Sequence, residues 1–340
     1  MKKMVSILAA MTLTLSLVAC GTDAAKEKET ETAAPVAEEQ TTSDDSGKTY
    51  NVGVIQLVQH PALDSATEGF EKALKDKLGD NVTVTIENAS GDIPTCATIA
   101  NTFVSDNVDL IMANATPALQ AAQTATNSVP IVATSITDYA SALDIEGWTG
   151  ATGINVTGTS DLAPLDGQAD MLKELFPDAK EVGIIYCSGE VNSLYQANTI
   201  AEKLEEFGYN VTHYTFSDSS DVGTVVQTAC SNSDVLYVPT DNVAANAAET
   251  INNVAVTEKV PIVAGEEGIC KGCGIATLSI SYYDIGYAAG LMAYEILANG
   301  ADPATMDIQY ATEFTKEYNP VIAETLGIEI PDDYTAIEME

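Results

Sequence analysis

Residues 51–78 read NVGVIQLVQHPALDSATEGFEKALKDKL, and this stretch decides the fold class. Residues 52–58 form a nearly continuous apolar run, which is typical of a strand buried on both faces of a parallel sheet. A polar turn follows at residues 59–61, and apolar residues then recur at helical spacing over 62–78. In open α/β sheets, ligands bind beyond the carboxyl ends of the strands. The turn at 59–61 is therefore the first place to look for a binding site.

The alternation of strand, polar turn and helix repeats along the chain and restarts once. It runs to residue 138, is interrupted by a Gly-, Thr- and Asn-rich segment at 147–159, and resumes with a helix predicted over 164–176. A chain of 340 residues has room for two domains. We therefore predict an α/β fold class with two doubly wound parallel-sheet lobes joined by a hinge.

The lobe boundaries follow from where the pattern breaks. We expect the long helix from Tyr282 to Leu297 to return to the first lobe, which then comprises residues 49–157 plus 282–304. The second lobe comprises residues 158–281 plus 305–340, with Ile308–Tyr310 and Val321–Leu326 closing it.

The first 48 residues are predicted to lie outside the fold. Residues 1–19 have a basic start and an apolar core of signal-peptide length. Cys20 directly after Ala19 resembles a bacterial lipobox, which implies cleavage before Cys20 and lipidation of its sulfur. Residues 20–48 are then a lipidated cysteine with a disordered tether, poor in large apolar side chains. An ordinary signal peptide with an incidental cysteine is the alternative.

The charge and the basic residues limit the partners. A net charge of −36 argues against nucleic acid and anionic membrane surfaces as electrostatic partners. The chain has no arginine, because all 14 basic residues are lysines. Bidentate guanidinium recognition of a carboxylate is therefore excluded.

The cysteines leave two options open. Five follow Cys20, at positions 96, 187, 230, 270 and 273, and which of them pair cannot be read from the sequence. Cys270 and Cys273 have the spacing of half a zinc site or of a redox pair, but no second metal-ligating motif accompanies them. We expect loop thiols or a local disulfide there, and no metal or cofactor.

Several short motifs together resemble a known family. They are the substrate-binding lipoproteins of ABC importers of the tryptophan/tyrosine-binding type, whose fold is that of type I periplasmic binding proteins. The resemblance covers about residues 50–330 and rests on the segments 59–64, 115–118, 155–158, 238–242, 265–268 and 281–286. It implies capture of a small solute, most simply tryptophan, tyrosine or phenylalanine, and its delivery to an ABC permease and ATPase. It also implies a monomer that is lipid-anchored to the outer face of the cell membrane.

An amino-acid ligand would need three kinds of partner, and polar turns at strand ends supply them. Its carboxylate would be held by hydroxyls, amides and helix N-termini, for which the candidates are Thr116, Ser188, Thr240 and Asn242. Its ammonium needs an anion, for which the candidates are Asp64, Asp138, Asp241 and Glu267. An aromatic ring needs flat apolar walls, which His60, Pro61, Leu63, Tyr139, Tyr195, Tyr282 and Tyr283 could supply. The full predicted ligand-binding set is Gln59, His60, Asp64, Asn114, Thr116, Thr137, Asp138, Ser188, Asn192, Ser193, Thr240, Asp241, Asn242, Gly265, Glu267 and Tyr282.

Alternatives remain for both the residues and the function. Ordinary helix capping, surface charge and domain packing are the alternatives for these side chains. Enzyme motifs such as GxSxG, a P-loop, HExxH or GxGxxG after the first strand are absent from the sequence, so we predict no catalysis. Other solutes (a branched amino acid, a nucleoside or a sugar), a ligand-sensing partner of a membrane receptor, and a thiol enzyme built on Cys270 and Cys273 are the competing functions.

Overall fold

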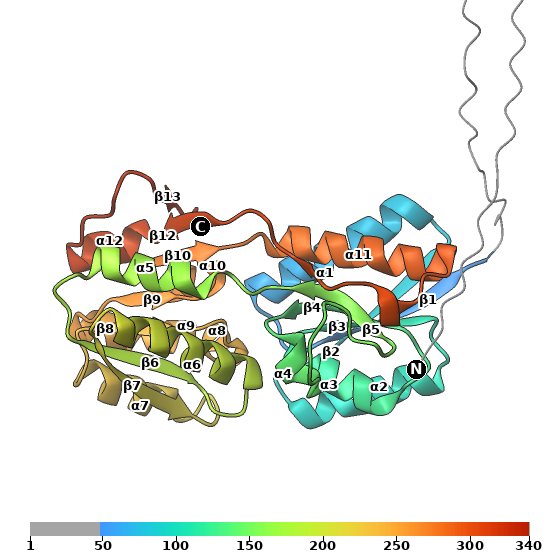
Figure 1. The fold of residues 1–340 in the computed structure, drawn as a ribbon, viewed down its shortest axis with the longest axis horizontal. Helices are drawn as coiled ribbons and strands as arrows, with labels where there is room; N and C mark the ends of the chain where they lie inside the picture. The colour runs from blue at the N-terminus through green and yellow to red at the C-terminus, as the bar shows by residue number, and fades with distance from the viewer. Residues whose placement is uncertain (1–47, 340) are drawn as a thin grey trace, which may run out of the picture. The chain divides into compact units, whose positions relative to one another are not determined.

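The computed structural model describes residues 48–339, which form one compact unit with two α/β lobes. The predicted signal peptide, Cys20 and tether lie outside these residues. Figure 1 shows the two lobes side by side, with the chain passing between them several times.

The first lobe is a six-stranded sheet in which every pairing is parallel. Its strand order is β11-β5-β4-β3-β1-β2. The strands are β1 (Tyr50–Gln56), β2 (Val82–Asn88), β3 (Leu110–Asn114), β4 (Ile131–Ile136), β5 (Val156–Ser160) and β11 (Gln309–Tyr310). The helices are α1 (Pro61–Leu78), α2 (Ile93–Ser105), α3 (Thr116–Ala125), α4 (Tyr139–Leu143) and α11 (Tyr282–Asn299), with a short 3-10 helix η1 (Pro303–Thr305).

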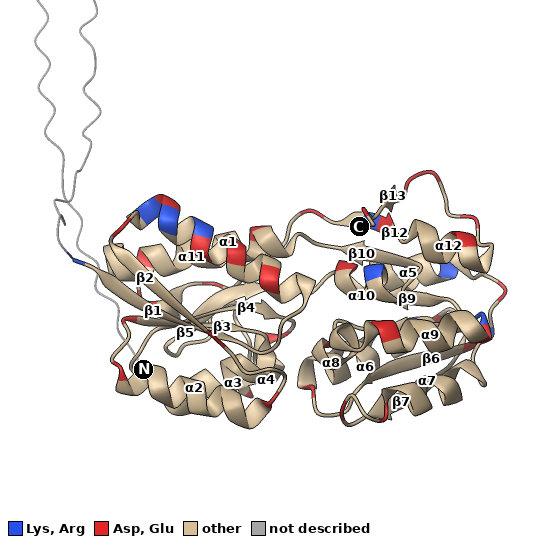
Figure 2. Cartoon of the chain, turned by 180° about the vertical axis from the view of Figure 1, so that it is seen from behind, with Lys and Arg blue, Asp and Glu red and all other residues tan. Residues whose placement is uncertain are grey.

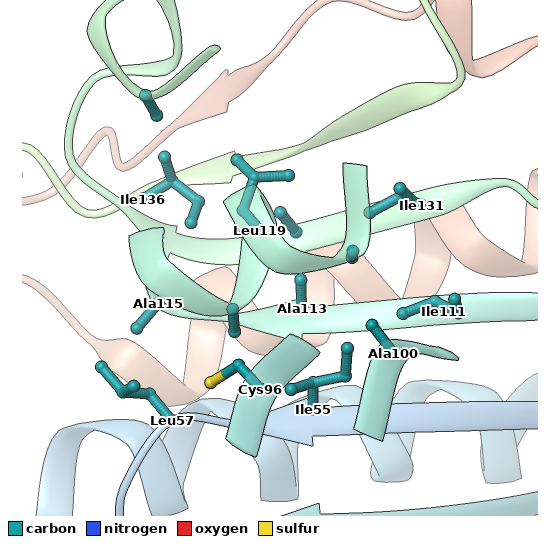
Figure 3. Packing of buried hydrophobic residues seen from close by; sticks show 14 of the residues in the cluster. Ile55, Leu57, Cys96, Ala100, Ile111, Ala113, Ala115, Leu119, Ile131 and Ile136 are labelled. Carbon is teal, nitrogen blue, oxygen red and sulfur yellow. The ribbon is translucent and has the colours of Figure 1, made fainter. Parts of the chain in front are cut away.

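The apolar run of β1 is buried on both faces, as predicted. Val54 packs with the helices α1 and α11, whereas its neighbour Ile55 packs with α2 and α3 on the opposite face. This alternation follows from the two-residue period of a strand. Figure 3 shows the second of these cores, where Cys96 and Leu119 meet the strands.

Helices α1 and α11 touch through glycines. A Cβ atom on Gly69 would lie 2.1 Å from the carbonyl oxygen of Tyr283, and one on Gly286 would lie 2.0 Å from that of Ala66. Only residues without a side chain permit this approach of two helix backbones. The contact fixes the long helix on the first lobe, as the sequence predicts.

The second lobe repeats the plan with a seven-stranded sheet of order β13-β12-β10-β9-β8-β6-β7. Its pairings are parallel except for that of β10 with β12. The strands are β6 (Glu181–Cys187), β7 (Asn210–Phe216), β8 (Val235–Val238), β9 (Ile262–Ala264), β10 (Ala276–Ser279), β12 (Thr315–Tyr318) and β13 (Thr335–Ala336). The helices are α5 (Leu165–Leu175), α6 (Val191–Glu206), α7 (Val222–Cys230), α8 (Asn242–Asn246), α9 (Ala248–Glu258), α10 (Glu267–Gly272) and α12 (Pro320–Leu326).

The structure confirms the fold class but moves two lobe boundaries. The predicted break after residue 157 falls inside β5, all of which belongs to the first sheet. The Gly- and Thr-rich sequence of β5 is not typical of a strand, so this strand was not predicted. Gly158 is needed there because β5 approaches β4 so closely that a Cβ atom at Gly158 would lie 1.9 Å from the carbonyl oxygen of Ala133. Gln309–Tyr310, assigned to the second lobe, also pair with β5 in the first sheet. The chain therefore crosses between the sheets near 161–164, 280–281 and 311–314.

Three further observations bear on the predictions made from the sequence. Within residues 48–339, no helix is both long and apolar enough to cross a membrane. The five cysteines of this region are buried free thiols, so Cys270 and Cys273 do not form the local disulfide that was one option. No group of three or more metal-ligating side chains occurs in the same region.

Candidate functional site

The two lobes meet at the carboxyl ends of their strands and enclose a small polar cavity. Its walls come from the turns after β1, β4, β5, β6, β8 and β9 and from the start of α11. The free space is about 10 Å³, roughly the room that one water needs, so the lobes are closed on each other. The twelve lining residues are His60, Leu63, Ser135, Thr137, Asp161, Asn192, Thr240, Asp241, Asn242, Ala245, Glu266 and Tyr282.

One hydrogen bond joins the lobes directly across this cavity. His60 Nε2, from the turn before α1, lies 3.3 Å from Asn242 Oδ1, at the start of α8. Burial lowers the pKa of His60 below its usual value, although Asn242 and the nearby Asp64 act in the opposite direction. His60 is therefore neutral at pH 7.

Among the acids of the cavity, Asp161 accepts the fewest hydrogen bonds from backbone N–H groups. Its side chain is 4 % exposed, directly after β5, where the chain leaves the first lobe. Its two carboxylate oxygens accept hydrogen bonds from the Thr137 hydroxyl at 3.0 Å and the Tyr282 hydroxyl at 3.1 Å. Burial raises its pKa to about 6, and the nearby Glu190 acts in the same direction. The hydrogen bonds from the two hydroxyl groups and from the backbone N–H of Asp161 compensate only part of the lost hydration.

Three more buried acids line or adjoin the cavity, and each is held by backbone N–H groups. Asp241 accepts from the N–H groups of Cys187 and Ala244, at 2.6 and 2.8 Å. Glu266 caps α10 through the N–H groups of Gly268 and Ile269, and burial raises its pKa to about 7. Glu190 accepts from the N–H groups of Asn242 and Val243. These three carboxylates thus have structural roles that Asp161 lacks.

Polar atoms without a partner also face the cavity. In the described part of the chain, His60 Nδ1, Ser135 Oγ and Asn192 Oδ1 are buried and make no hydrogen bond. The three side chains are 8 %, 5 % and 5 % exposed. Ser135 also has a φ of 58°, a strained value for a residue with a side chain. Unpaired buried groups and local strain are common at binding sites, so this cavity is the candidate site of the structure.

A second, less polar hollow of about 210 Å³ adjoins the cavity at Asn242, which lines both. Glu190, the hydrogen-bond partner of Asn242, also lines this hollow. Its apolar lining comes from both lobes: Leu57, Val58, Ile93 and Pro117 from the first, and Val243 from the second. A polar cavity beside an apolar hollow suits a ligand with a charged end and an apolar side chain.

The site has no cation of its own. Neither the cavity nor the adjoining hollow has a lysine among its lining residues. Figure 2 shows acidic residues spread over both lobes, while α2 and α3, which border the hollow on the first lobe, carry no charged residue. The field at the site is therefore set by the buried carboxylates.

The structure brings seven of the predicted site residues to the cavity. They are His60, Thr137, Asn192, Thr240, Asp241, Asn242 and Tyr282. Leu63, proposed only as an apolar wall, also lines it.

The other nine predicted residues lie off the cavity. Gln59, Ser188 and Glu267 are exposed. Glu267 lines another hollow with Lys271 and Glu317, and this hollow shares Glu266 and Tyr282 with the cavity. The remaining six serve local structure. Asp64 accepts from Gln56, Asn114 donates to the Leu63 carbonyl, Thr116 is buried at the start of α3, Asp138 caps α4, Ser193 donates to the Thr240 carbonyl, and Gly265 packs against the Thr240 backbone.

Sequence reasoning missed four polar residues of the site. Ser135 lies near the end of β4, just before the turn from which Thr137 and Asp138 were chosen. Glu190 precedes a helix in the same way as Asp241. Glu266 is one residue before the acid that was chosen, Glu267. Asp161 directly follows β5, whose Gly- and Thr-rich sequence was not recognised as a strand, so an acid at the end of this segment was the available signal.

The chain is similar to known proteins over most of its length. Residues 51–338 match the protein-family model described as ABC transporter substrate binding protein. The chain is 41 % identical over 256 residues to a tyrosine-binding protein of Clostridioides difficile, with 74 % of each chain covered.

Two solved structures are similar over most of the chain. One, from Streptococcus pneumonia, is in complex with L-Trp and has a TM-score of 0.80 at 31 % identity, covering 84 % of this chain and 97 % of that one. The other is a ligand-free, open substrate-binding protein with adhesive properties from Clostridium difficile, with a TM-score of 0.66 at 35 % identity, covering 86 % and 100 %. The predicted family and fold are thus confirmed, and the chain is an extracytoplasmic substrate-binding protein of an ABC transporter with the type I periplasmic-binding-protein fold.

Proposed function

We propose that the solute is an aromatic amino acid, bound between the two lobes with its ammonium on Asp161. The observation that carries this proposal is the buried Asp161 carboxylate, which has two hydroxyl partners and no cation beside it. An ammonium would supply the missing positive charge and further hydrogen bonds at once.

The aromatic side chain is assigned to the adjoining hollow. Leu57, Val58 and Pro117 offer it an apolar wall, and its volume of about 210 Å³ leaves room for a ring. The names of the similar proteins support this choice, because one is called tyrosine-binding and another was solved with L-Trp.

Closure of the lobes is part of the proposal. The chain is more similar in shape to the L-Trp complex, with a TM-score of 0.80, than to the ligand-free open protein, with 0.66, although its identity to the open protein is higher. This order supports a closed arrangement of the lobes here. A ligand that contacts both lobes binds the closed state better and shifts the equilibrium toward it.

The remaining parts of the proposal concern anchoring and chemistry. We infer that Cys20 carries the lipid that holds a monomer at the outer face of the cell membrane, and that the protein delivers its solute to a permease without catalysis. Mass spectrometry of the mature N-terminus, searching for diacylglycerol on Cys20, tests the anchor.

Calorimetric titration with each of the twenty amino acids tests the solute. We expect heat from tyrosine, tryptophan or phenylalanine, and saturation at one site per chain. If heat comes only from non-aromatic amino acids, the aromatic assignment is wrong.

A further inference from the structure

The orientation of His60 is set by a chain of hydrogen bonds that begins on the other lobe. Asn242 Nδ2 donates to Glu190 Oε2 at 2.7 Å. The same carboxylate accepts from the N–H groups of Asn242 and Val243 and from Asn192 Nδ2. Because all four contacts come from N–H donors, Glu190 acts here as an acceptor only.

The direction of these bonds fixes the proton on His60. With its amide nitrogen on Glu190, Asn242 turns its oxygen, which has no proton to give, toward the ring of His60. His60 Nε2 must therefore donate the bond to Asn242 Oδ1. In a neutral ring the other nitrogen, Nδ1, is then a bare acceptor, and it is the buried atom without a partner.

Asn192 is oriented by the same carboxylate. Its Nδ2 lies within hydrogen-bond distance of three acceptors, Glu190 Oε2, Ser193 Oγ and the Thr240 carbonyl. Its Oδ1 is left without a partner in the cavity. Glu190 thus turns two acceptors, one from each lobe, toward the space that Asp161 also lines.

We infer that His60 Nδ1, Asn192 Oδ1 and the Asp161 carboxylate form a three-acceptor site for a primary ammonium, which offers three N–H donors. The inference rests on the proposed function in taking the ligand to be an amino acid. It goes further in naming His60 as a residue that contacts the ammonium and Asn242 and Glu190 as the residues that position it. Since His60 lies on the first lobe and Asn242 on the second, the acceptor is oriented only when the lobes close. Recognition of the ammonium and closure are therefore one event.

Acid should switch this acceptor off. A proton on Nδ1 turns it into a donor and places a positive charge beside the ammonium. The titratable groups around His60 are Asp64 on α1 and, on the cavity walls, Asp161, Asp241, Glu266 and Tyr282, with Glu190 behind Asn242. Burial dominates over these acids and lowers the pKa of His60, so the neutral ring persists through pH 7.

The test is to observe the ring nitrogens directly. The chain has two histidines, so ¹⁵N–¹H spectra of the full protein are assigned with one variant, His213→Gln. We expect His60 saturated with tyrosine to be neutral with its proton on Nε2. A proton on Nδ1, or an imidazolium in the complex at pH 7.5, would overturn the inference.

Two substitutions give a second readout by calorimetry. His60→Leu removes both nitrogens and should weaken tyrosine binding roughly ten- to hundredfold, the effect of a charge-assisted hydrogen bond. His60→Gln keeps a donor and an acceptor, so it should bind within a few-fold of the native chain and lose less affinity between pH 7 and pH 5. N,N-dimethyltyrosine, with one N–H in place of three, should bind the native chain at least about tenfold more weakly than tyrosine.

The outcomes separate this inference from the proposed function. Tyrosine binding that is unchanged in His60→Leu removes the inference and leaves the aromatic assignment intact. Binding of a different amino acid with the same dependence on His60 removes the aromatic assignment and leaves the inference intact. If none of the twenty amino acids binds, both are wrong.

Discussion

Replacing Asp161 with asparagine should make the protein more stable and a poorer binder at the same time. The carboxylate is buried between two hydroxyl groups, and burial raises its pKa from 3.8 to about 6. A shift of roughly two units corresponds to about 3 kcal/mol, because each unit is worth about 1.4 kcal/mol. This amount is the cost of keeping the charge in the closed, ligand-free protein.

The sign of the effect depends on pH. A group whose pKa is higher in the folded than in the unfolded state stabilises the fold below pH 3.8, and this contribution is lost as the pH rises through about 6. Above pH 6 the native chain therefore carries the full penalty, whereas the neutral amide of Asp161→Asn does not. We expect the variant to gain about 1–3 kcal/mol at pH 7.5 and much less near pH 4, where the Asp161 carboxyl is neutral in the folded protein.

Binding should change in the opposite direction. Removing one partner of a buried ion pair costs about 3–5 kcal/mol, so the affinity for the amino acid should fall at least about a hundredfold. Urea unfolding at pH 4 and 7.5, with calorimetric titration of tyrosine at pH 7.5, measures both effects. Asp178→Asn, at an exposed aspartate between α5 and β6, is the matched control and should change neither. A variant that binds tyrosine like the native chain, or that is less stable at pH 7.5, would refute the role of Asp161.

Three further changes test the contacts that stabilise the two lobes. Gly158→Ala should destabilise the first lobe by about 4 kcal/mol or more, because φ is 150° and a Cβ atom would meet a main-chain oxygen of β4; urea unfolding measures this. Gly286→Ala should cost about 3 kcal/mol by the same assay, since it forces α11 away from α1, and unchanged stability would contradict the glycine contact. A reducing agent should leave the midpoint of unfolding unchanged, because Cys270, Cys273 and the other described thiols are not paired; a lowered midpoint would reveal a disulfide.

The fold could be predicted because its signal is repeated. The two-residue alternation of a strand buried on both faces, followed by a helical stripe, occurs in β1 and α1 and returns in each lobe. The missed strand β5 shows the limit of this reasoning. Its Gly158 is required by a close approach to β4, and such contacts between distant segments cannot be read from local composition.

The sequence indicates where the residues of the candidate site lie along the chain, but not which side chains line the cavity. Turns at the carboxyl ends of strands supplied seven of the cavity residues, since topology places those ends together. Some predicted residues near these strand ends do not line the cavity because they bind local partners instead. Asp64 accepts a hydrogen bond from Gln56, and Asp138 accepts one from the backbone of α4. Which acid lines the cavity depends on the direction of its side chain. Glu266 lines the cavity whereas the next residue, Glu267, does not, so a shift of one position changes the outcome.

The helix N-termini around the site are used differently from the expectation for a chain without arginine. They were expected to hold the carboxylate of the ligand, but α8 and α10 are capped by the protein's own Asp241 and Glu266. The N-terminus of α3, beside the apolar hollow, has no side-chain cap, and its N-cap residue Ala115 is held at a φ of 87°. Pro117, the second residue of α3, has no N–H group to donate to an anion, so this helix start does not replace the two capped ones as a site for the ligand's carboxylate.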